Sequence, residues 1–328
     1  MKVGIVVIGR NEGQRLALSL ESARQTAVPV VYVDSASSDD SVSLARLLGV
    51  KVLALDAARP LSAARARNEG ATRLLEAHPD TRYVQFLDAD SVLAPGWISR
   101  AVEELDAHAG CAAVIGHVLE RNAGLSAYNR LCALEWRSLP GELRNFGALG
   151  GIAMVRAGVF RALGGFRPEV IAGEDSELGV RMALAGHTVR KVDHPMATHD
   201  AHMTRFGQWW TRAVRGGHAI GQRFELNGRS SARDCAKERA STLFWGLGLP
   251  LAILATVVPS GGASLWLMLA YPVLAARVWW HRRRIGDEPR DALLYAAFIV
   301  PTKFAEALGL LRFYLNRFSN RYRIIEYK

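Results

Sequence analysis

The feature that most limits how this chain can fold is a run of 37 residues, Ala240 to Ala276, without one charged side chain. A helix needs about 20 apolar residues to cross a bilayer, so the run is long enough for two crossings of slightly less than average length. The sequence "PSGG" (259–262) lies near its middle and is typical of a turn. We therefore expect a transmembrane helical hairpin, roughly 242–258 and 263–280. A helical pair buried in a soluble core is the alternative.

Basic residues flank this charge-free run on both sides. Residues 205–239 hold seven arginines and one lysine against three acidic residues, and "HRRR" (281–284) follows the second apolar half. Lysine and arginine gather on the cytoplasmic side of membrane proteins. We therefore expect both flanks on the cytoplasmic side and the "PSGG" turn on the other.

A third apolar segment, residues 291–315, is interrupted by Lys303, Glu306 and Arg312. These charges favour an amphipathic helix that lies in the membrane interface. The alternative is a third span in which Lys303 and Glu306 pair with each other. The tail "RFSNRYRIIEYK" is basic and suits anionic lipid headgroups.

The charge balance narrows the class of partner. The formal net charge is +10, which suits a phosphate-bearing ligand or an anionic membrane surface. The arginines crowd beside the apolar run and do not spread over a soluble face, so lipid explains them better than nucleic acid does. Half of the 328 residues are hydrophobic, which is enough for a sizeable core.

The cysteines and the first residues bear on the compartment. Cys111, Cys132 and Cys235 form no CxxC pair, so we expect reduced thiols and no cysteine zinc site. The opening "MKVGIVVIGRNEG" has a short apolar run and no cleavage-like site, unlike a secretory signal. We read it as a first strand and expect the N-terminal part to stay in the cytosol.

Strand and helix patterns alternate along the first 90 residues. Short apolar runs and helical stripes follow each other at the pace of a parallel sheet with crossover helices. We expect strands at 3–9, 28–34, 50–55 and 82–88, a helix at 62–77, further strands near 111–118 and 149–155, and further helices near 97–107, 125–138 and 175–185. Such sheets bind ligands at the carboxyl ends of their strands, where Asp34 and Asp88 fall.

The sequence "FLDAD" (86–90) ends a buried strand with two aspartates. Residues i and i+2 of a strand point to the same side, so Asp88 and Asp90 are expected to converge. Two adjacent carboxylates repel each other unless a cation lies between them. Mg²⁺ or Mn²⁺ suits such oxygen ligands and can bridge to the phosphates of a nucleotide. A solvated turn is the alternative.

Five segments, in this order, resemble the motifs of the family 2 glycosyltransferases. They are "VVIGRNEGQRL" (6–16), "VVYVDSASSDDSV" (30–42), "ARARNEGA" (64–71), "FLDAD" (86–90), and "LGGIAMVRAGVFRALGGF" (149–166) with "GEDSELGVRMALAGHTV" (173–189). The chain departs from the family where Ser35 replaces the second aspartate of the second motif. The QxxRW motif of processive synthases is absent, and "QWWTR" (208–212) stands near its place. Processive polymerisation is therefore not expected.

The resemblance implies a GT-A fold, a nucleotide-sugar donor, a divalent metal and inversion at the anomeric carbon. It implies that Asp175, in the pair Glu174–Asp175, is the base that deprotonates the acceptor hydroxyl. A helix start with acids that favour the dipole is an additional reading of that pair. His199 and His202 are the candidate histidine ligands of the metal, with a plain surface histidine as the alternative for each.

Other candidate residues would bind the nucleotide sugar. Asp34 can accept hydrogen bonds from a base or ribose, or cap the following helix. Arg67 suits the base or the diphosphate, and Asn68 is expected to anchor the same loop. Gly151 would let the sugar or the acceptor approach the backbone. We expect Arg212 to stabilise the leaving diphosphate. We expect Arg65 to be a solvated helix residue.

The sequence thus predicts a GT-A-like, mostly parallel α/β sheet flanked by helices, followed by a transmembrane hairpin and an amphipathic helix. The expected parts are a catalytic domain at 1–205, a basic juxtamembrane segment at 206–240, the hairpin at 241–280 and an interfacial basic segment at 281–328. The expected activity is transfer of a sugar from a nucleotide-diphosphate donor to a lipid-linked or glycan acceptor at the cytosolic face of the membrane, with Mn²⁺ or Mg²⁺ as cofactor.

Two alternatives to this activity remain open. One is a polyprenyl-phosphate glycosyltransferase, which moves one sugar onto a lipid phosphate. The other is a membrane partner subunit that keeps the fold without catalysis. The intact DxD and ED pairs argue against the second alternative.

Overall fold

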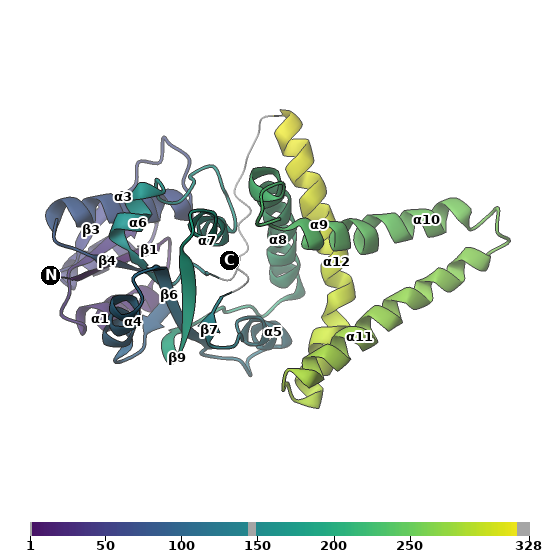
Figure 1. Ribbon diagram of the computed structural model, residues 1–328, viewed down its shortest axis with the longest axis horizontal. Helices are drawn as coiled ribbons and strands as arrows, with labels where there is room; N and C mark the ends of the chain where they lie inside the picture. Colours follow the sequence, from purple (N-terminus) through teal and green to yellow (C-terminus); the bar gives the residue numbers. More distant parts are fainter. Residues whose placement is uncertain (1, 144–148, 320–328) are drawn as a thin grey trace. The chain divides into compact units, whose positions relative to one another are not determined.

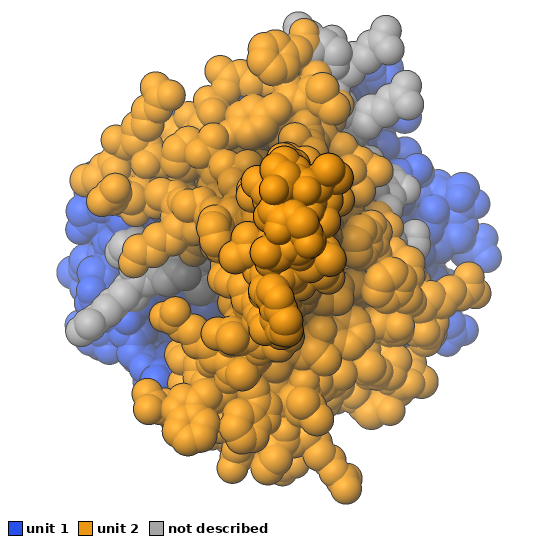
Figure 2. All heavy atoms as spheres, turned by 90° about the vertical axis from the view of Figure 1, so that its right-hand side faces the viewer, with its two compact units in different colours: residues 1–122, 136–201 blue, residues 123–135, 202–328 orange. Residues whose placement is uncertain are grey.

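The structure is a computed structural model, and it describes residues 2–143 and 149–319. The chain forms two compact units, which Figure 2 shows in different colours. One unit combines Met1–Asn122 with Trp136–Ala201, and the other combines Ala123–Glu135 with His202–Lys328.

Within the described residues, the first unit is built on a nine-stranded sheet of order β3-β2-β1-β4-β8-β6-β9-β5, with β7 paired to β9. Its strands are β1 (Val3–Gly9), β2 (Val30–Asp34), β3 (Lys51–Ala54), β4 (Tyr83–Asp88), β5 (Ser91–Leu93), β6 (Cys111–Glu120), β7 (Gly141–Glu142), β8 (Ala153–Arg156) and β9 (Thr188–His199). The strands β1 to β4 are mutually parallel, and β8 is antiparallel to both of its neighbours.

Helices cover both faces of this sheet. They are α1 (Gln14–Arg24), α2 (Ser41–Leu47), α3 (Ala63–Ala77), α4 (Trp97–Ala107), α6 (Ala157–Ala162) and α7 (Glu174–Leu184). In Figure 1, α3 and α6 lie on one face, and α1 and α4 lie on the other. The apolar run of β1 is buried between the two layers, as expected of a strand in a parallel sheet.

The mostly parallel α/β architecture expected from the sequence is confirmed, and the expected first four strands appear within two residues of their positions. The sheet order reverses between β1 and β4, because the chain leads from β1 to β2 on one side and reaches β4 on the other. A crevice at such a reversal, beyond the carboxyl ends of the strands, is where open α/β sheets bind ligands. Asp88 is the last residue of β4 and therefore lies at that edge.

Within the described residues, the second unit is helical. It contains α5 (Ala127–Glu135), α8 (Phe206–Asn227), α9 (Ala236–Leu243), a π-helical segment (Phe244–Gly248), α10 (Leu249–Thr256), a 3₁₀ segment (Ala263–Leu269), α11 (Ala270–Arg284) and α12 (Pro289–Ser319). The helix expected near 125–138 is α5, and it belongs to this unit.

Three helices of the described chain are long and apolar enough to cross a membrane: Ala236–Thr256, Ala263–Arg284 and Pro289–Phe318. The first two contain the expected hairpin, and in Figure 1 they run out together and meet at the turn between α10 and α11. Only 6% of the apolar stretch in Ala263–Arg284 is buried. α12 meets the same criteria of length and composition, and its Lys303 and Glu306 form an ion pair of 2.8 Å.

α12 packs closely along α8 because glycines line the contact. A Cβ atom at Gly217 would collide with the backbone oxygen of Glu306, and one at Gly309 would collide with the backbone oxygen of Val214. A Cβ at Gly221 would come within 2.6 Å of the Phe313 ring. The two helix backbones therefore touch at this crossing, as small residues allow.

Candidate active site

A buried arginine joins two acidic residues at the carboxyl edge of the sheet. Arg67 in α3 donates from Nη2 to Oδ1 of Asp88 at 2.7 Å and from Nη1 to Oε1 of Glu174 at 2.6 Å. Its side chain is 3% exposed. Burial acts to lower the pKa of Arg67, but Asp88, Glu174 and Asp175 outweigh it and hold that pKa above its ordinary value. Arg67 is therefore a permanent cation that ties the end of β4 to the start of α7.

Two glycines make room for this arrangement. Gly151 lies so close to Arg67 that a Cβ atom there would collide with Nη2 of the guanidinium and lie 3.1 Å from Oδ2 of Asp88. Gly165 has φ +70°, and a Cβ there would lie 2.5 Å from Oδ1 of Asn68. Asn68 uses its whole amide on one residue: Nδ2 donates to the Phe166 carbonyl at 2.7 Å, and Oδ1 accepts from the Phe166 N–H at 2.9 Å. Asn68 thus holds the loop after α6 from its place in α3.

The acidic pair at the start of α7 divides into two environments. Glu174 is buried on Arg67, whereas Asp175 is only half-buried and is bonded through Oδ1 to the N–H of Ser176 at 2.6 Å. Gly173 precedes them with φ +73°, a conformation that glycine adopts without strain. Glu174, Asp175 and Glu177 all lie in the first helical turn, where their charge favours the helix dipole.

Asp34 lies at the end of β2 and organises the loop that follows. Its Oδ1 accepts from the Tyr32 hydroxyl at 2.9 Å and the Ser37 hydroxyl at 2.5 Å, and its Oδ2 accepts from the Ser37 N–H at 2.9 Å. Burial, then the Asp34 carboxylate, raises the pKa of Tyr32 far above its ordinary value. The residue at the N-terminal cap of α2 is Asp40, so Asp34 is not the helix cap considered as its alternative.

Asp90 lies in a second, separate set of polar residues. It follows β4 in a turn and does not belong to the strand, so the alternation of strand side chains does not bring it onto Asp88. Oδ2 of Asp90 is 3.3 Å from Nε2 of His199, and Nδ1 of His199 is 3.5 Å from Oε2 of Glu120. Asp90 and Glu120 are both buried. Glu120 was not expected from the sequence, because only the pairing of β6 with β9 reveals that it lies beside His199.

The residues around Asp90 can hold a divalent ion. Two ligand atoms that bind one ion at about 2.1 Å and about a right angle lie about 3 Å apart, close to the 3.3 Å between Oδ2 of Asp90 and Nε2 of His199. Among residues 2–143 and 149–319, no group of three or more His, Cys, Asp or Glu residues forms a metal cluster. Mg²⁺-type sites commonly use one or two protein ligands and complete the shell with substrate phosphates and water.

His202 and Arg212, two other expected site residues, belong to the second unit. His202 is exposed and has φ +44°. Arg212 lies in α8 and forms an ion pair of 2.6 Å with Glu135 at the end of α5. Their participation in the active site therefore stays a prediction.

The expectation for Arg65 is wrong. This residue was expected to be solvated, but it is buried at the start of α3, and its Nη1 donates to the carbonyls of Asp56, Arg59 and Pro60. Its Nε pairs with Glu69 at 2.6 Å. The loop after β3 turns back over α3, and Arg65 satisfies the carbonyls that this turn exposes.

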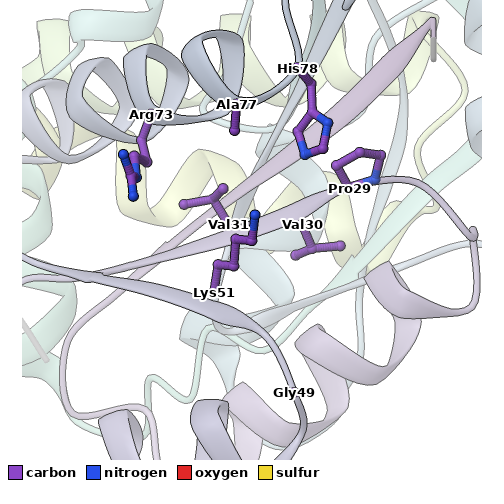
Figure 3. Close-up of a pocket in the computed structure, with 8 residues that line it drawn as sticks. All are labelled: Pro29, Val30, Val31, Gly49, Lys51, Arg73, Ala77 and His78. Atoms are coloured by element: carbon purple, nitrogen blue, oxygen red, sulfur yellow. The ribbon is translucent and has the colours of Figure 1, made fainter.

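A separate hollow of about 400 Å³ lies at the opposite end of the strands (Figure 3). It is lined by the starts of β2 and β3 and the end of α3, among them Lys51, Arg73 and His78. Basic side chains beside the carboxyl end of a helix complement its dipole. The hollow therefore requires no ligand to explain its charge, and it is not part of the site.

Comparison with known proteins agrees with this architecture. Residues 4–164 match the family model described as glycosyl transferase family 2. The succinoglycan biosynthesis protein ExoA of Rhizobium meliloti (strain 1021) is 25% identical over 205 residues, which cover 58% of this chain and 60% of that protein. An uncharacterized glycosyltransferase of Rickettsia felis (strain ATCC VR-1525 / URRWXCal2) is 38% identical over 52 residues, 16% of this chain and 18% of that protein. These alignments span less than two thirds of either relative.

Solved structures share the fold. The mannosyltransferase PcManGT from Pyrobaculum calidifontis, in complex with GDP-Man and Mn²⁺, has a TM-score of 0.61 at 21% identity, over 94% of this chain and 87% of that chain. S. aureus TarS 1–349, in complex with UDP, has a TM-score of 0.52 at 15% identity, over 98% of this chain and 93% of that chain. Residues 4–164 of this chain are therefore a glycosyl transferase family 2 domain, and the sheet and helices share the fold of these solved structures.

Proposed function

We propose that this chain is a metal-dependent, inverting glycosyltransferase of the membrane surface, which moves a sugar from a nucleotide-diphosphate donor to a lipid-linked or glycan acceptor. The observation that carries the proposal is that the acidic residues at the carboxyl edge of the sheet have different partners. Asp88 and Glu174 neutralise Arg67, Asp90 faces His199, and Asp175 stays half-buried. Asp175 is thus the carboxylate that is left for proton transfer.

Asp175 is the base in this mechanism. It accepts the proton of the acceptor hydroxyl as the hydroxyl oxygen attacks the anomeric carbon of the donor sugar. The new C–O bond forms while the bond from that carbon to the phosphate oxygen breaks, and the nucleoside diphosphate leaves with the electron pair. Attack from the side opposite the leaving group inverts the configuration. Glu174 and Arg67 fix the start of α7, so that Asp175 keeps its position.

Asp90 and His199 would hold the divalent ion, Mn²⁺ or Mg²⁺. When bound, this ion neutralises the charge that develops on the leaving diphosphate. The complex of PcManGT with GDP-Man and Mn²⁺, and that of TarS with UDP, are consistent with a nucleotide-sugar donor here. Asp34 and the loop that it organises are the proposed contacts to the nucleoside, with Arg67, Asn68, Asp88 and Gly151 as the remaining proposed contacts to the donor.

The second unit is proposed to attach the enzyme to the membrane. Its hairpin is apolar along its exposed surface, with Leu251, Leu254, Trp266 and Val273 each at least half exposed. α8 and α12 run side by side and across the direction of this hairpin in Figure 1, and Figure 2 looks along the hairpin onto its tip. A bilayer that contains the hairpin would therefore have α8 and α12 lying along its surface, where their arginines can meet headgroups.

The activity would operate on the cytosolic face, because the arginines beside the hairpin favour that side. An acceptor carried on a lipid would then be delivered within the plane of the membrane. The name of ExoA, a succinoglycan biosynthesis protein, is consistent with a role in making an envelope polysaccharide.

The test uses membranes that contain the full chain, with GDP- and UDP-sugars and Mn²⁺. We expect donor turnover by the wild type and a loss of at least about 100-fold in Asp175→Asn, because general base catalysis contributes 10²–10⁴-fold. Glu76→Gln, an exposed carboxylate of α3, serves as the matched control. Full activity in Asp175→Asn would rule out the mechanism. Extraction of labelled product into organic solvent would distinguish a lipid-phosphate acceptor from a glycan acceptor.

A further inference from the structure

The register of β9 places His199 between two buried carboxylates. In the sheet, His199 is the partner of Glu120 in β6 and of Ser91 in β5. Asp90 immediately precedes Ser91, and its backbone oxygen accepts from the N–H of Asp200 at 3.2 Å. The imidazole therefore has Asp90 on its Nε2 side and Glu120 on its Nδ1 side.

Glu120 is held rigidly for a charged side chain. Its carboxylate is 0% exposed. Oε1 accepts from the N–H of Asn122 at 3.2 Å, and Oε2 accepts from the N–H of Ala201 at 3.1 Å. These two bonds fix Glu120 at the ends of β6 and β9, with Oε2 directed at the imidazole. A buried carboxylate is stable only where hydrogen bonds or a nearby cation compensate for its lost hydration, and the two N–H groups supply such bonds while they hold Oε2 beside His199.

The ring of Trp136 fixes the imidazole from a third direction. It packs edge-on against His199, with the ring centroids 4.6 Å apart and the planes at 80°. Such edge-to-face packing restricts rotation of the smaller ring. Glu120, Trp136 and Asp90 thus lie around the His199 imidazole on three sides.

We propose that Glu120 is a positioning residue that keeps the His199 proton on Nδ1, so that the Nε2 lone pair faces Asp90 and the metal site favours Mn²⁺ over Mg²⁺. This inference rests on the proposed function, because it assumes that Asp90 and His199 hold the ion. Histidines that bind metals commonly donate their other N–H to a carboxylate, which sets the tautomer and raises the basicity of the ligating nitrogen. The 3.5 Å separation is longer than a hydrogen bond, and catalytic hydrogen bonds are often long before ligands bind.

The metal preference follows from the type of ligand. Mg²⁺ is a hard ion that prefers oxygen, whereas imidazole nitrogen suits first-row transition ions. A nitrogen ligand with a fixed lone pair therefore favours Mn²⁺ more than a site made of two carboxylates would. If Glu120 were absent, the ring could carry its proton on Nε2, and the ion would lose that ligand.

The experiment uses the full chain in detergent, with Mn²⁺ and either GDP or UDP, and compares Glu120→Gln, Glu120→Ala and the control Glu76→Gln. Pulsed electron paramagnetic resonance reads the ¹⁴N coupling of His199 to Mn²⁺, with His199→Gln as the blank. Displacement of Mn²⁺ by Mg²⁺ gives the preference between the two ions. Thermal unfolding of each variant confirms that it is folded. Glu120→Gln can still accept the Nδ1 proton but lacks the charge that raises the basicity of Nε2. If Glu120→Ala does not fold, wild-type Mn²⁺ affinity and metal preference in Glu120→Gln would therefore overturn the inference.

We expect ¹⁴N coupling in the wild type and in Glu76→Gln. We expect Glu120→Ala to weaken Mn²⁺ binding by about 10- to 100-fold, to lose the coupling and to reduce the preference for Mn²⁺. Glu120→Gln should lose less affinity and keep the coupling. Wild-type coupling and metal preference in both Glu120 variants would overturn the inference while leaving the metal site intact. Absence of ¹⁴N coupling in the wild type with both nucleotides would overturn the metal assignment itself, and this inference with it.

Discussion

At the scale of single residues, the site contains a buried cation, Arg67, whose charge is already paired with two carboxylates of the chain. Both terminal nitrogens of Arg67 are bonded to carboxylates, so its first role is to hold Asp88 and Glu174 in place. The motif "ARARNEGA" indicated that Arg67 belongs to the site, but its sequence could not show these partners. They lie 21 and 107 residues away along the chain, and only the packing of α3 against both the end of β4 and the start of α7 brings them together.

Arg67→Met should destabilise the chain by about 3–5 kcal/mol, because removal of one member of a buried ion pair leaves the other charges uncompensated. Arg67→Lys keeps the charge, but one ammonium group cannot reproduce the two-pronged contact, so we expect a smaller loss of stability and a large loss of activity. Thermal unfolding and donor turnover measure the two effects. Arg73→Met, an exposed arginine of the same helix, is the control. Equal stability of the Arg67 and Arg73 variants would contradict the structural role of the clamp, a name we use for Arg67 with its partners Asp88 and Glu174.

Two glycines offer a matched test of the space around the clamp. Gly151→Ala should push a methyl group into Nη2 of Arg67 and abolish most of the activity. Gly158→Ala adds the same methyl group in α6, where a Cβ meets nothing within 4 Å, and should leave activity unchanged and stabilise the helix by about 0.5–1 kcal/mol. Donor turnover of the two variants checks this. Full activity in Gly151→Ala would show that the clamp tolerates displacement.

At the scale of elements, strong hydrophobic periodicity predicted where the strands lie, but the sequence did not predict how the strands pair. The apolar runs of β1 and β4 predicted their positions, because burial on both faces selects continuous hydrophobic residues. β9 was missed because "TVRKVDHPMATH" is mostly polar and contains Pro195, which argues against a strand. Its pairing with β6 has shifts of register near His117, opposite Pro195. That missed strand carries His199 to Asp90 and Glu120, so the candidate metal site could be named from sequence only in part.

The contact between α8 and α12 predicts opposite outcomes for neighbouring glycines. Gly217→Ala should cost about 1–3 kcal/mol, because its methyl group meets the backbone of Glu306 and neither helix can yield without moving the other. Gly216→Ala meets nothing within 4 Å and should be neutral or slightly stabilising. Thermal unfolding in detergent compares the pair. A Gly217→Ala variant as stable as Gly216→Ala would contradict the close approach of the helices.

The same helix crossing buries a histidine whose titration should be visible. His218 in α8 is 0% exposed, packs on Phe313, and has no hydrogen-bond partner for either ring nitrogen within the described chain. Burial, then the charge of Arg215, lowers the pKa of His218 to about 4 from its usual 6.5. The unfolded chain therefore binds this proton first as the pH falls, so stability is fully present above pH 6.5 and decreases toward pH 4.

This difference corresponds to about 3 kcal/mol across that pH range. We expect His218→Leu to remove this part of the acid sensitivity, whereas His78→Leu, a partly exposed histidine outside the second unit, should retain it. Unfolding free energies at a series of pH values between 7 and 4 provide the measurement. Identical pH profiles for His218→Leu and the wild type would contradict a buried neutral imidazole.

At the scale of the whole molecule, the sequence predicted a membrane hairpin followed by an interfacial helix, and the third helix remained open because composition alone fits a span. The arrangement within the second unit favours the interface. α12 is joined by touching backbones to α8, which contains Arg212, Arg215 and Arg223 and is too polar to cross a bilayer. If α8 stays at the surface, α12 must stay there with it.

Labelling of single cysteines with a membrane-impermeant maleimide tests this arrangement. The positions are Ser260 at the hairpin turn, Glu288 before α12 and Phe318 near its end, all of which are exposed. Because α12 would lie along the surface, Glu288→Cys and Phe318→Cys should both react from the cytosolic side, and Ser260→Cys should react from the other side. The unmodified chain is the control, since its three native cysteines are buried and should not react. Reaction of Phe318→Cys from the same side as Ser260→Cys would show instead that α12 spans the bilayer. That result would contradict the placement of α12 at the membrane surface beside α8.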